Sequence, residues 1–205
     1  AAQHNGYDDC VYVISGRRNS ENADGSDPNA PGAVEFLTDV YEFNPTRFRA
    51  EAYDRTSDAY QDPISPWRQR ADVPRCVMAG TAIAVGQSHV MVLGGADGSL
   101  FHRGDELRDD HPGFPKSALS YHTITDTWVE AGALPANHVT TAAVRWGADT
   151  VNDPIIIPSG EVRPRVRSPI VWQVRPERSS GRFGAFDFSV IVVYLMALIG
   201  VGIFF

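Results

Sequence analysis

The chain has 205 residues, of which 43% are hydrophobic and 21% are charged. This balance is typical of folded proteins and argues against a disordered or collagen-like chain, and two cysteines are too few for a disulfide framework or a structural zinc site. The net charge of −7 argues against a nucleic-acid-binding protein, because such proteins normally carry a basic face.

Residues 1–182 carry no helical periodicity of useful length. Instead, short apolar runs rich in β-branched residues recur at 11–14, 90–93 and 155–157. A turn of small residues closes each run: Ser15-Gly16, Gly94-Gly95 and Pro158-Ser159-Gly160. Such runs, bounded by glycine and proline, predict many short strands rather than helices.

Further strands follow the apolar runs in a fixed order. Runs that carry an aromatic residue come next, at 39–43, 118–122 and 169–173. Tryptophan strands that end in proline follow two of them, at 67–74 and 128–135, and small alternating strands follow the prolines, at 78–85 and 140–144. This order predicts a repeated four-stranded unit of the kind found in propeller blades, in which the Tyr and Trp rings pack between blades.

The marker residues of these units resemble the kelch family of β-propellers: Gly94-Gly95, Tyr121 and Trp128 in the complete unit, and Gly16, Tyr41 and Trp67 in the unit before it. The resemblance implies an all-β fold, an incomplete kelch-type β-propeller of about two and a half blades of four-stranded antiparallel sheets. We expect a propeller domain over 1–175, with blades at roughly 10–74, 75–135 and 136–175. Three strands are expected in the first blade, four in the second and three in the third, so this piece is not expected to close alone. Polar insertions interrupt it at 17–34, 45–66 and 96–115.

The third unit carries the candidate chemistry. Glu161 comes directly after the small-residue turn, and Arg163, Arg165 and Arg167 follow it at alternate positions. Arginine binds carboxylates in a bidentate manner and glutamate can transfer a proton, so this cluster suits an anionic sugar. The alternative is a solvated polar loop in which Glu161 only neutralises Arg163 or Arg165.

Residues 159–172 resemble the Gly-Glu-x-[Lys/Arg]-Pro-x-x-Arg stretch of the bacterial sialic acid mutarotases (N-acetylneuraminate epimerases), which are six-bladed kelch-type propellers. The stretch 94–128, with His111-Pro112 in its long insert, resembles the same family. The resemblance implies an isomerase that exchanges the anomers of a sialic acid without a metal or other cofactor. It assigns the catalytic acid and base to Glu161 and a second active-site role to Arg167.

Other residues are candidates for substrate binding. Arg163 and Arg165 are expected to help Arg167 hold the substrate carboxylate, and Arg17, Arg75 and His138 stand at positions that can face a central channel. A surface or core role is the alternative for His138. The six histidines lack metal-ligand spacing, so no metal site is predicted, and Cys10 and Cys76 either pair or are small buried residues.

The C-terminal segment differs from the rest of the chain. Residues 188–205 are uncharged, and 18 residues in a helix span about 27 Å, close to the roughly 30 Å hydrocarbon core of a bilayer. We expect a linker at 176–185 and a truncated first transmembrane helix at 186–205; a buried helix is the alternative. The chain starts without methionine and stops within this run, so we expect a piece of a longer protein.

The tail is similar to the first helix of sodium:solute symporters, and the interrupted third blade resembles the circularly permuted branch of the mutarotases. This implies a membrane-anchored, periplasmic propeller tethered to a sodium-coupled transporter, with sodium acting only in the transporter part. Arg175, Arg178 and Arg182 precede the helix and, by the positive-inside rule, favour the opposite orientation. Alternative functions are a non-catalytic sugar-binding or sensing propeller and a kelch protein-interaction module.

Overall fold

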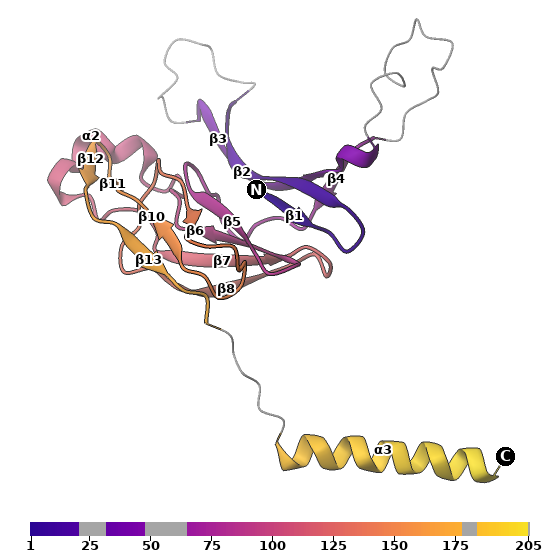
Figure 1. The fold of residues 1–205 in the computed structure, drawn as a ribbon. Helices are drawn as coiled ribbons and strands as arrows, with labels where there is room; N and C mark the ends of the chain where they lie inside the picture. Colours follow the sequence, from indigo (N-terminus) through magenta and orange to yellow (C-terminus); the bar gives the residue numbers. More distant parts are fainter. Residues whose placement is uncertain (21–31, 48–64, 178–183, 205) are drawn as a thin grey trace, which may run out of the picture. The chain divides into compact units, whose positions relative to one another are not determined.

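A computed structural model describes residues 1–20, 32–47, 65–177 and 184–204 (Figure 1). The chain forms two compact units, Ala1–Arg175 and Pro176–Phe205. The first unit consists mostly of antiparallel strands, as the short apolar runs predict. The predicted insertions at 17–34 and 45–66 lie partly outside the described residues.

Two complete four-stranded antiparallel sheets form the centre of this unit. The strands of the first sheet lie in chain order: β1 (Ala2–His4), β2 (Asp9–Asn19), β3 (Val34–Phe43) and β4 (Trp67–Arg70). The second sheet repeats this order: β5 (Thr81–Val85), β6 (His89–Leu93), β7 (Ser117–His122) and β8 (Thr127–Ala133). The two sheets therefore have the same topology, which is the repeat expected from the sequence.

The third sheet has three strands in the order β13-β10-β9: β9 (Val144–Arg145), β10 (Ile155–Ile157) and β13 (Trp172–Val174). A separate hairpin lies between β10 and β13 in the chain and consists of β11 (Gly160–Arg163) and β12 (Val166–Ser168). The insertion at 96–115 contains three short helical segments: η2 (Phe101–Arg103), α2 (Gly104–Leu107) and η3 (Arg108–Asp110). Another turn of 3-10 helix, η1 (Pro45–Arg47), follows β3.

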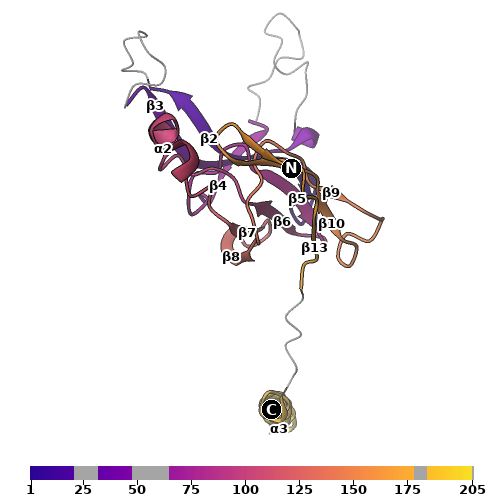
Figure 2. The same ribbon diagram turned by 90° about the vertical axis from the view of Figure 1, so that its left-hand side faces the viewer.

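The second sheet buries both of its faces, because β6 alternates between two cores. Met91 and Leu93 pack with Ile155 and Ile157 of the third sheet. Val90 and Val92 point the other way, into clusters shared with the first sheet that include Tyr12 and Val40. Figures 1 and 2 show the second sheet between its two neighbours in chain order.

Two of the aromatic residues predicted to lie between units, Tyr121 and Trp128, do so at the contact of the first two sheets, whereas Tyr41 and Trp67 of the first sheet are exposed. Tyr121 is fully buried and meets the ring of Tyr12 edge-on, with centroids 5.7 Å apart. Its hydroxyl donates to Asp126 Oδ1 (2.7 Å), and the indole of Trp128 donates to the carbonyl of Ala71 (2.9 Å). The rings of Tyr121 and Trp128 therefore fill apolar space and satisfy their polar atoms.

The small-residue pair after the apolar run of each repeat shares one backbone conformation; in the first repeat it lies within β2, at a register shift between Ile14 and Gly16. The first residue of the pair is left-handed in all three repeats, with φ of 57° at Ser15, 72° at Gly94 and 45° at Ser159. The following residue has φ between 94° and 139° and is always glycine, because such angles exclude side chains. Serine therefore replaces glycine only at the first of the two positions, where the left-handed backbone angle still permits a side chain.

Several boundaries differ from the sequence prediction. The first sheet begins at Ala2, because residues 2–4 add a fourth strand through pairs such as Gln3 with Cys10. The small alternating strands are shorter than expected, and residues 159–168 form a paired hairpin rather than a polar turn. Cys10 and Cys76 are separate buried thiols, not a disulfide.

The second unit contains one helix, α3 (Ala185–Phe204), which begins one residue before the predicted segment. It is long and apolar enough to cross a bilayer, by length and composition. Its single charged residue, Asp187, accepts a hydrogen bond from the backbone N–H of Gly184 (2.9 Å) at the start of the helix. The helix is therefore a candidate membrane span.

Candidate functional site

The repeats bring three residues to one equivalent position. Arg17, Ala96 and Glu161 each follow directly after the turn glycine of their repeat. Ala96 and Glu161 also make the same isolated antiparallel bridge within their own repeats, Ala96 with Met78 and Glu161 with Val139. Equivalent positions in stacked repeats lie at the same end of their sheets, so this end is the candidate site.

Glu161 and Arg167 are direct neighbours across the β11–β12 hairpin. The backbone of Glu161 uses both of its hydrogen bonds on Val139, each at 2.9 Å. Glu161 and Arg167 are therefore a non-hydrogen-bonded pair, the type in which opposite side chains approach most closely and share one face. The predicted acid and base and the predicted second active-site residue are thus side by side.

Two donors hold the Glu161 carboxylate, which is half-buried. Its Oε1 accepts from the backbone N–H of Arg165 (2.6 Å), and its Oε2 accepts from the hydroxyl of Thr140 (3.4 Å). Neither contact is an ion pair. The polar-loop alternative, in which Glu161 neutralises Arg163 or Arg165, does not describe this arrangement.

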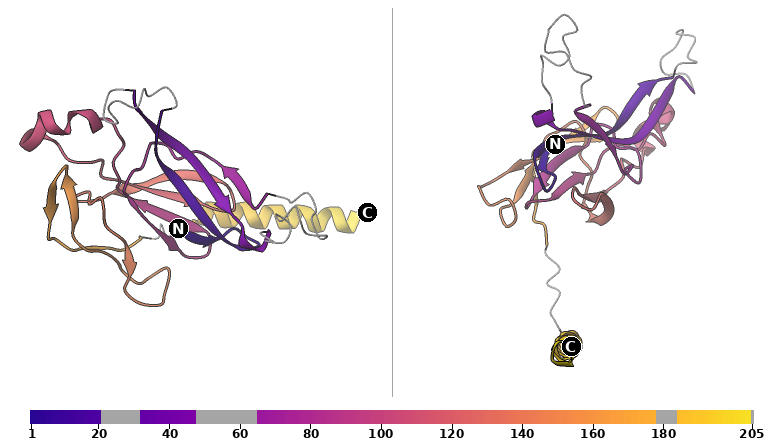
Figure 3. Two further views of the ribbon diagram at one scale, coloured as in Figure 1. Left: turned by 90° about the horizontal axis from the view of Figure 1, so that it is seen from above. Right: turned by 90° about the vertical axis from the view of Figure 1, so that its right-hand side faces the viewer.

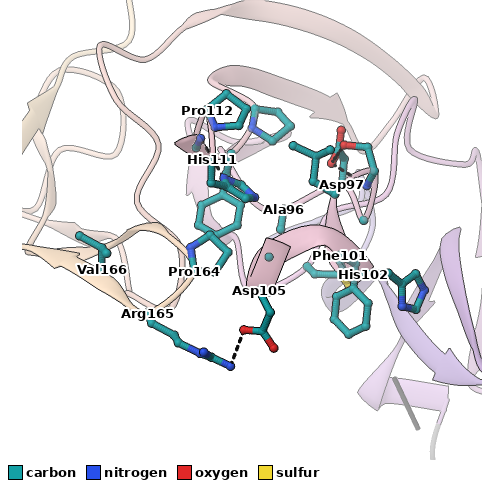
Figure 4. Close-up of a pocket in the computed structure, with 18 of the residues that line it drawn as sticks. Ala96, Asp97, Phe101, His102, Asp105, His111, Pro112, Pro164, Arg165 and Val166 are labelled. Atoms are coloured by element: carbon teal, nitrogen blue, oxygen red, sulfur yellow. Dashed lines mark hydrogen bonds and ion pairs between the residues drawn. The ribbon is translucent and has the colours of Figure 1, made fainter. Parts of the chain in front are cut away.

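The guanidiniums of Arg163 and Arg165 pair instead with the helical insertion. Arg163 lies 2.7 Å from Asp109 and also donates to the carbonyl of Arg108 (3.0 Å). Arg165 lies 2.8 Å from Asp105 (Figure 4). Both arginines, which the sequence suggested as substrate ligands, thus bind carboxylates of the protein itself.

Arg17 and Arg167 differ from these two arginines. Both side chains are exposed, and neither has an ion pair within residues 1–20, 32–47, 65–177 and 184–204. The guanidinium carbon of Arg17 lies 4.8 Å above the ring of Phe101 in the insertion, a cation–π geometry. Their charges remain available to an anion.

Arg75 is held within the protein. Its guanidinium donates to the hydroxyl and carbonyl of Ser117 (3.1 and 3.3 Å) and to the carbonyls of Cys76 (3.0 Å) and Gly94 (2.9 Å). Burial lowers its pKa. These bonds tie the chain before β5 to the turn after β6, so Arg75 has a structural position.

His138 is buried, at 3% exposure, beside Trp172 and Gly160. The indole N–H of Trp172 donates to its Nε2 (3.3 Å), so the neutral ring carries its proton on Nδ1. That Nδ1 has no hydrogen-bond partner among the residues that the structure describes. A β-carbon at Gly160 would lie 2.7 Å from the Cβ of His138, which explains the close approach to the turn before Glu161.

A cavity of about 730 Å³ lies between the insertion and the tip of the hairpin (Figure 4). Pro164, Arg165 and Val166 form one wall. The opposite wall includes Asp97, Phe101, His102, Asp105 and His111. A smaller cavity of about 380 Å³ lies beside Arg17.

Sequence reasoning did not propose Asp105, Asp109 or Thr140 for the site. Asp105 and Asp109 lie in the polar insertion at 96–115, and their charges complement those of the arginine-rich hairpin. The opposite charges of the insertion and the hairpin are the feature of the sequence that could have identified these residues. They do not reveal which carboxylate reaches which guanidinium.

No protein family model and no curated protein matches the chain. Among solved structures, that of YjhT matches with a TM-score of 0.56 and 18% sequence identity, over 83% of this chain and 46% of YjhT. The chain therefore spans less than half the length of YjhT. At this identity the likeness concerns the fold: the β-sheet unit is built like part of YjhT.

Proposed function

We propose that the β-sheet unit is part of a kelch-type propeller that interconverts the anomers of a sugar acid of the sialic acid class. The related fold of YjhT supports the propeller, and the resemblance of residues 159–172 to the sialic acid mutarotases supports the sugar-acid class. The observation that carries the proposal is the pairing of Glu161 with Arg167 across the hairpin. A carboxylate that can transfer a proton beside a guanidinium that can bind the substrate carboxylate supports anomer exchange of an anionic sugar.

The reaction needs one group that both accepts and donates a proton. Glu161 takes the proton of the anomeric hydroxyl while the ring C–O bond breaks and then gives that proton to the ring oxygen, directly or through water, which yields the open keto form. After rotation of the carbonyl, the same steps in reverse close the ring on the other face. No bond to the protein forms, and no electrons are transferred.

Arginines orient the substrate in this scheme. Arg167 binds the carboxylate of the sugar acid, because a guanidinium offers two parallel donors to it. Arg17, at the equivalent position of the first repeat, supplies a second charge from the neighbouring wall. His138 is not part of this scheme as a substrate ligand, because the residue is 3% exposed and its Nδ1 is buried; it packs behind the turn at Gly160.

Arg75, Arg163 and Arg165 have a different role in the proposal. Their guanidiniums bind protein carbonyls and carboxylates. They shape the walls of the site and do not contact the substrate.

Helix α3 is proposed to anchor the unit in a membrane, with the sheets on the periplasmic side and a sodium-coupled transporter following. The length and composition of α3 support the anchor. The orientation and the transporter rest on the sequence resemblance to symporters. Protease added to spheroplasts, whose outer membrane has been opened, would cleave the sheet unit if it is periplasmic, and cleavage only after lysis of the inner membrane would overturn that orientation.

Nuclear magnetic resonance of sialic acid anomers tests the enzymatic proposal on the intact protein that contains this chain. Exchange should accelerate with the native protein and slow by at least about 100-fold in Glu161→Gln, the size typical for loss of a general acid or base. Glu130→Gln, on the exposed surface of β8, is the matched control and should retain the native rate. Binding without acceleration would support a capture role instead, and no binding would favour an interaction module.

A further inference from the structure

We infer that Asp105 and Asp109 of the helical insertion are positioning residues, which hold the β11–β12 hairpin so that Glu161 and Arg167 keep their relative placement. This inference rests on the proposed function for its catalytic meaning. The contact itself exists independently of that function. The insertion and the hairpin are about 55 residues apart in sequence and meet at one place.

Contacts between the two segments are both ionic and steric. Arg163 binds Asp109 and the carbonyl of Arg108, while Arg165 binds Asp105. Gly113 lies so near the carbonyl of Val162 that a β-carbon there would be 3.0 Å from its oxygen. Figure 3 (left) shows the orange hairpin beside the pink helical segment.

Arg165 joins this contact to the candidate catalytic carboxylate. Its guanidinium binds Asp105, and its backbone N–H donates to Glu161. Arg165 is also left-handed, with φ of 65°, a conformation that disfavours residues with side chains. The left-handed Thr140 and Ser159 have counterparts in Ala79 and Ser15, so their conformations belong to the repeat, whereas that of Arg165 belongs to the hairpin.

The two ion pairs form a weak attachment. The side chain of Asp109 is 93% exposed, and those of Asp105 and Arg165 are 78% and 81% exposed. Exposed ion pairs contribute little individually and are screened by salt. The two ion pairs therefore hold the hairpin by their combined contribution. The stability of this attachment should depend on ionic strength. Small displacements of a catalytic group reduce rates strongly, so even a weak attachment affects turnover.

Hydrogen–deuterium exchange of the full chain tests the attachment without any substrate. In Asp105→Asn/Asp109→Asn, amides of residues 160–168 should exchange about two- to ten-fold faster than in the native protein, the range expected when two exposed ion pairs are lost. The matched control is Asp110→Asn, an exposed aspartate next to the pair, and it should exchange like the native protein. Unchanged exchange in the double variant would overturn the inference.

Kinetics on the intact protein test the catalytic consequence. The double variant should lower kcat about two- to ten-fold with little change in KM, because the substrate-binding arginines remain. The exchanged pair Arg163→Asp/Asp109→Arg should recover more activity than Arg163→Asp alone. Faster hairpin exchange with unchanged kcat would overturn the positioning role. If the native protein has no mutarotase activity while exchange still responds, the proposed function fails and the attachment stands.

Discussion

Arg17 and Glu161 occupy the same position in two repeats, although they are 144 residues apart in sequence and their side chains carry opposite charges. Each follows the glycine that ends the apolar strand of its repeat, and each begins a paired extension of that strand. In the first repeat the extension continues β2 and β3, and in the third it is the separate β11–β12 hairpin. The insertion packs against both, through Phe101 under Arg17 and Asp109 beside Arg163. Figure 2 shows α2 beside β2 and β3.

Replacing Arg17 tests whether this equivalence has a functional meaning. Arg17→Gln should raise KM for the sugar acid about ten-fold with a smaller change in kcat, since it removes one charge-assisted contact. Arg18→Gln is the control, because Arg18 is the next residue on the strand and pairs with Glu35. Equal effects of the two variants would argue against a specific role for Arg17.

A substitution of His138 tests whether its unpartnered Nδ1–H has a role in substrate binding. His138→Gln can still accept from the indole of Trp172 but lacks the Nδ1–H. Because that Nδ1 is buried, we expect the affinity for the sugar acid, measured by calorimetry, to change less than about two-fold. A five-fold or larger loss of affinity at unchanged stability would show that the ring reaches the substrate.

The contact between the first two sheets should depend on the hydroxyl of Tyr121. Tyr121→Phe leaves Asp126 Oδ1 without that donor, although the backbone N–H of Ala71 still reaches it (2.8 Å). We expect the free energy of unfolding in urea to fall by about 1–2 kcal/mol. Tyr7→Phe, at a side chain that is 89% exposed, should have no measurable effect.

Stability should fall on the acid side through His89. Partial desolvation of the His89 ring, which remains partly exposed, together with the neighbouring His122 lowers the pKa of His89 below its ordinary 6.5. The unfolded chain therefore binds this proton more readily, so the free energy of unfolding decreases as the pH falls through 6.5 and levels off below the pKa in the folded protein. His89→Gln should flatten that part of the pH profile in chemical denaturation. An unchanged slope would show that other groups cause it.

Helix α3 predicts association with lipid. The full chain should co-sediment with phosphatidylcholine vesicles, and replacing Val193 and Met196 with lysine should abolish this, because each charge costs about 2.5–3.5 kcal/mol at the centre of a membrane helix. The control places lysines at Pro176 and Glu177, outside both the helix and the sheets. Vesicle binding by both variants would contradict a spanning role.

Much of the fold follows from local sequence signals. Apolar runs such as 90–93 lie in strands, and the glycines of the following turns have the backbone angles that glycine permits. Tyr121 and Trp128 pack between sheets because their strands place large rings on one buried face. Residues 2–4 gave no comparable signal, since three residues show no periodicity and pair only because β2 offers a free edge.

The candidate site also combines features that follow from the local sequence with features that only the tertiary structure decided. The sequence alone determined that a carboxylate follows a strand-ending glycine and that three arginines follow at alternate positions, because turn chemistry and strand period are local properties. The tertiary structure decided that Arg163 and Arg165 bind the insertion, that Arg75 is enclosed by carbonyls and that Arg167 is free beside Glu161. A charge pairs with whichever opposite charge the packed chain brings within reach, and that distance is not encoded in the neighbouring residues.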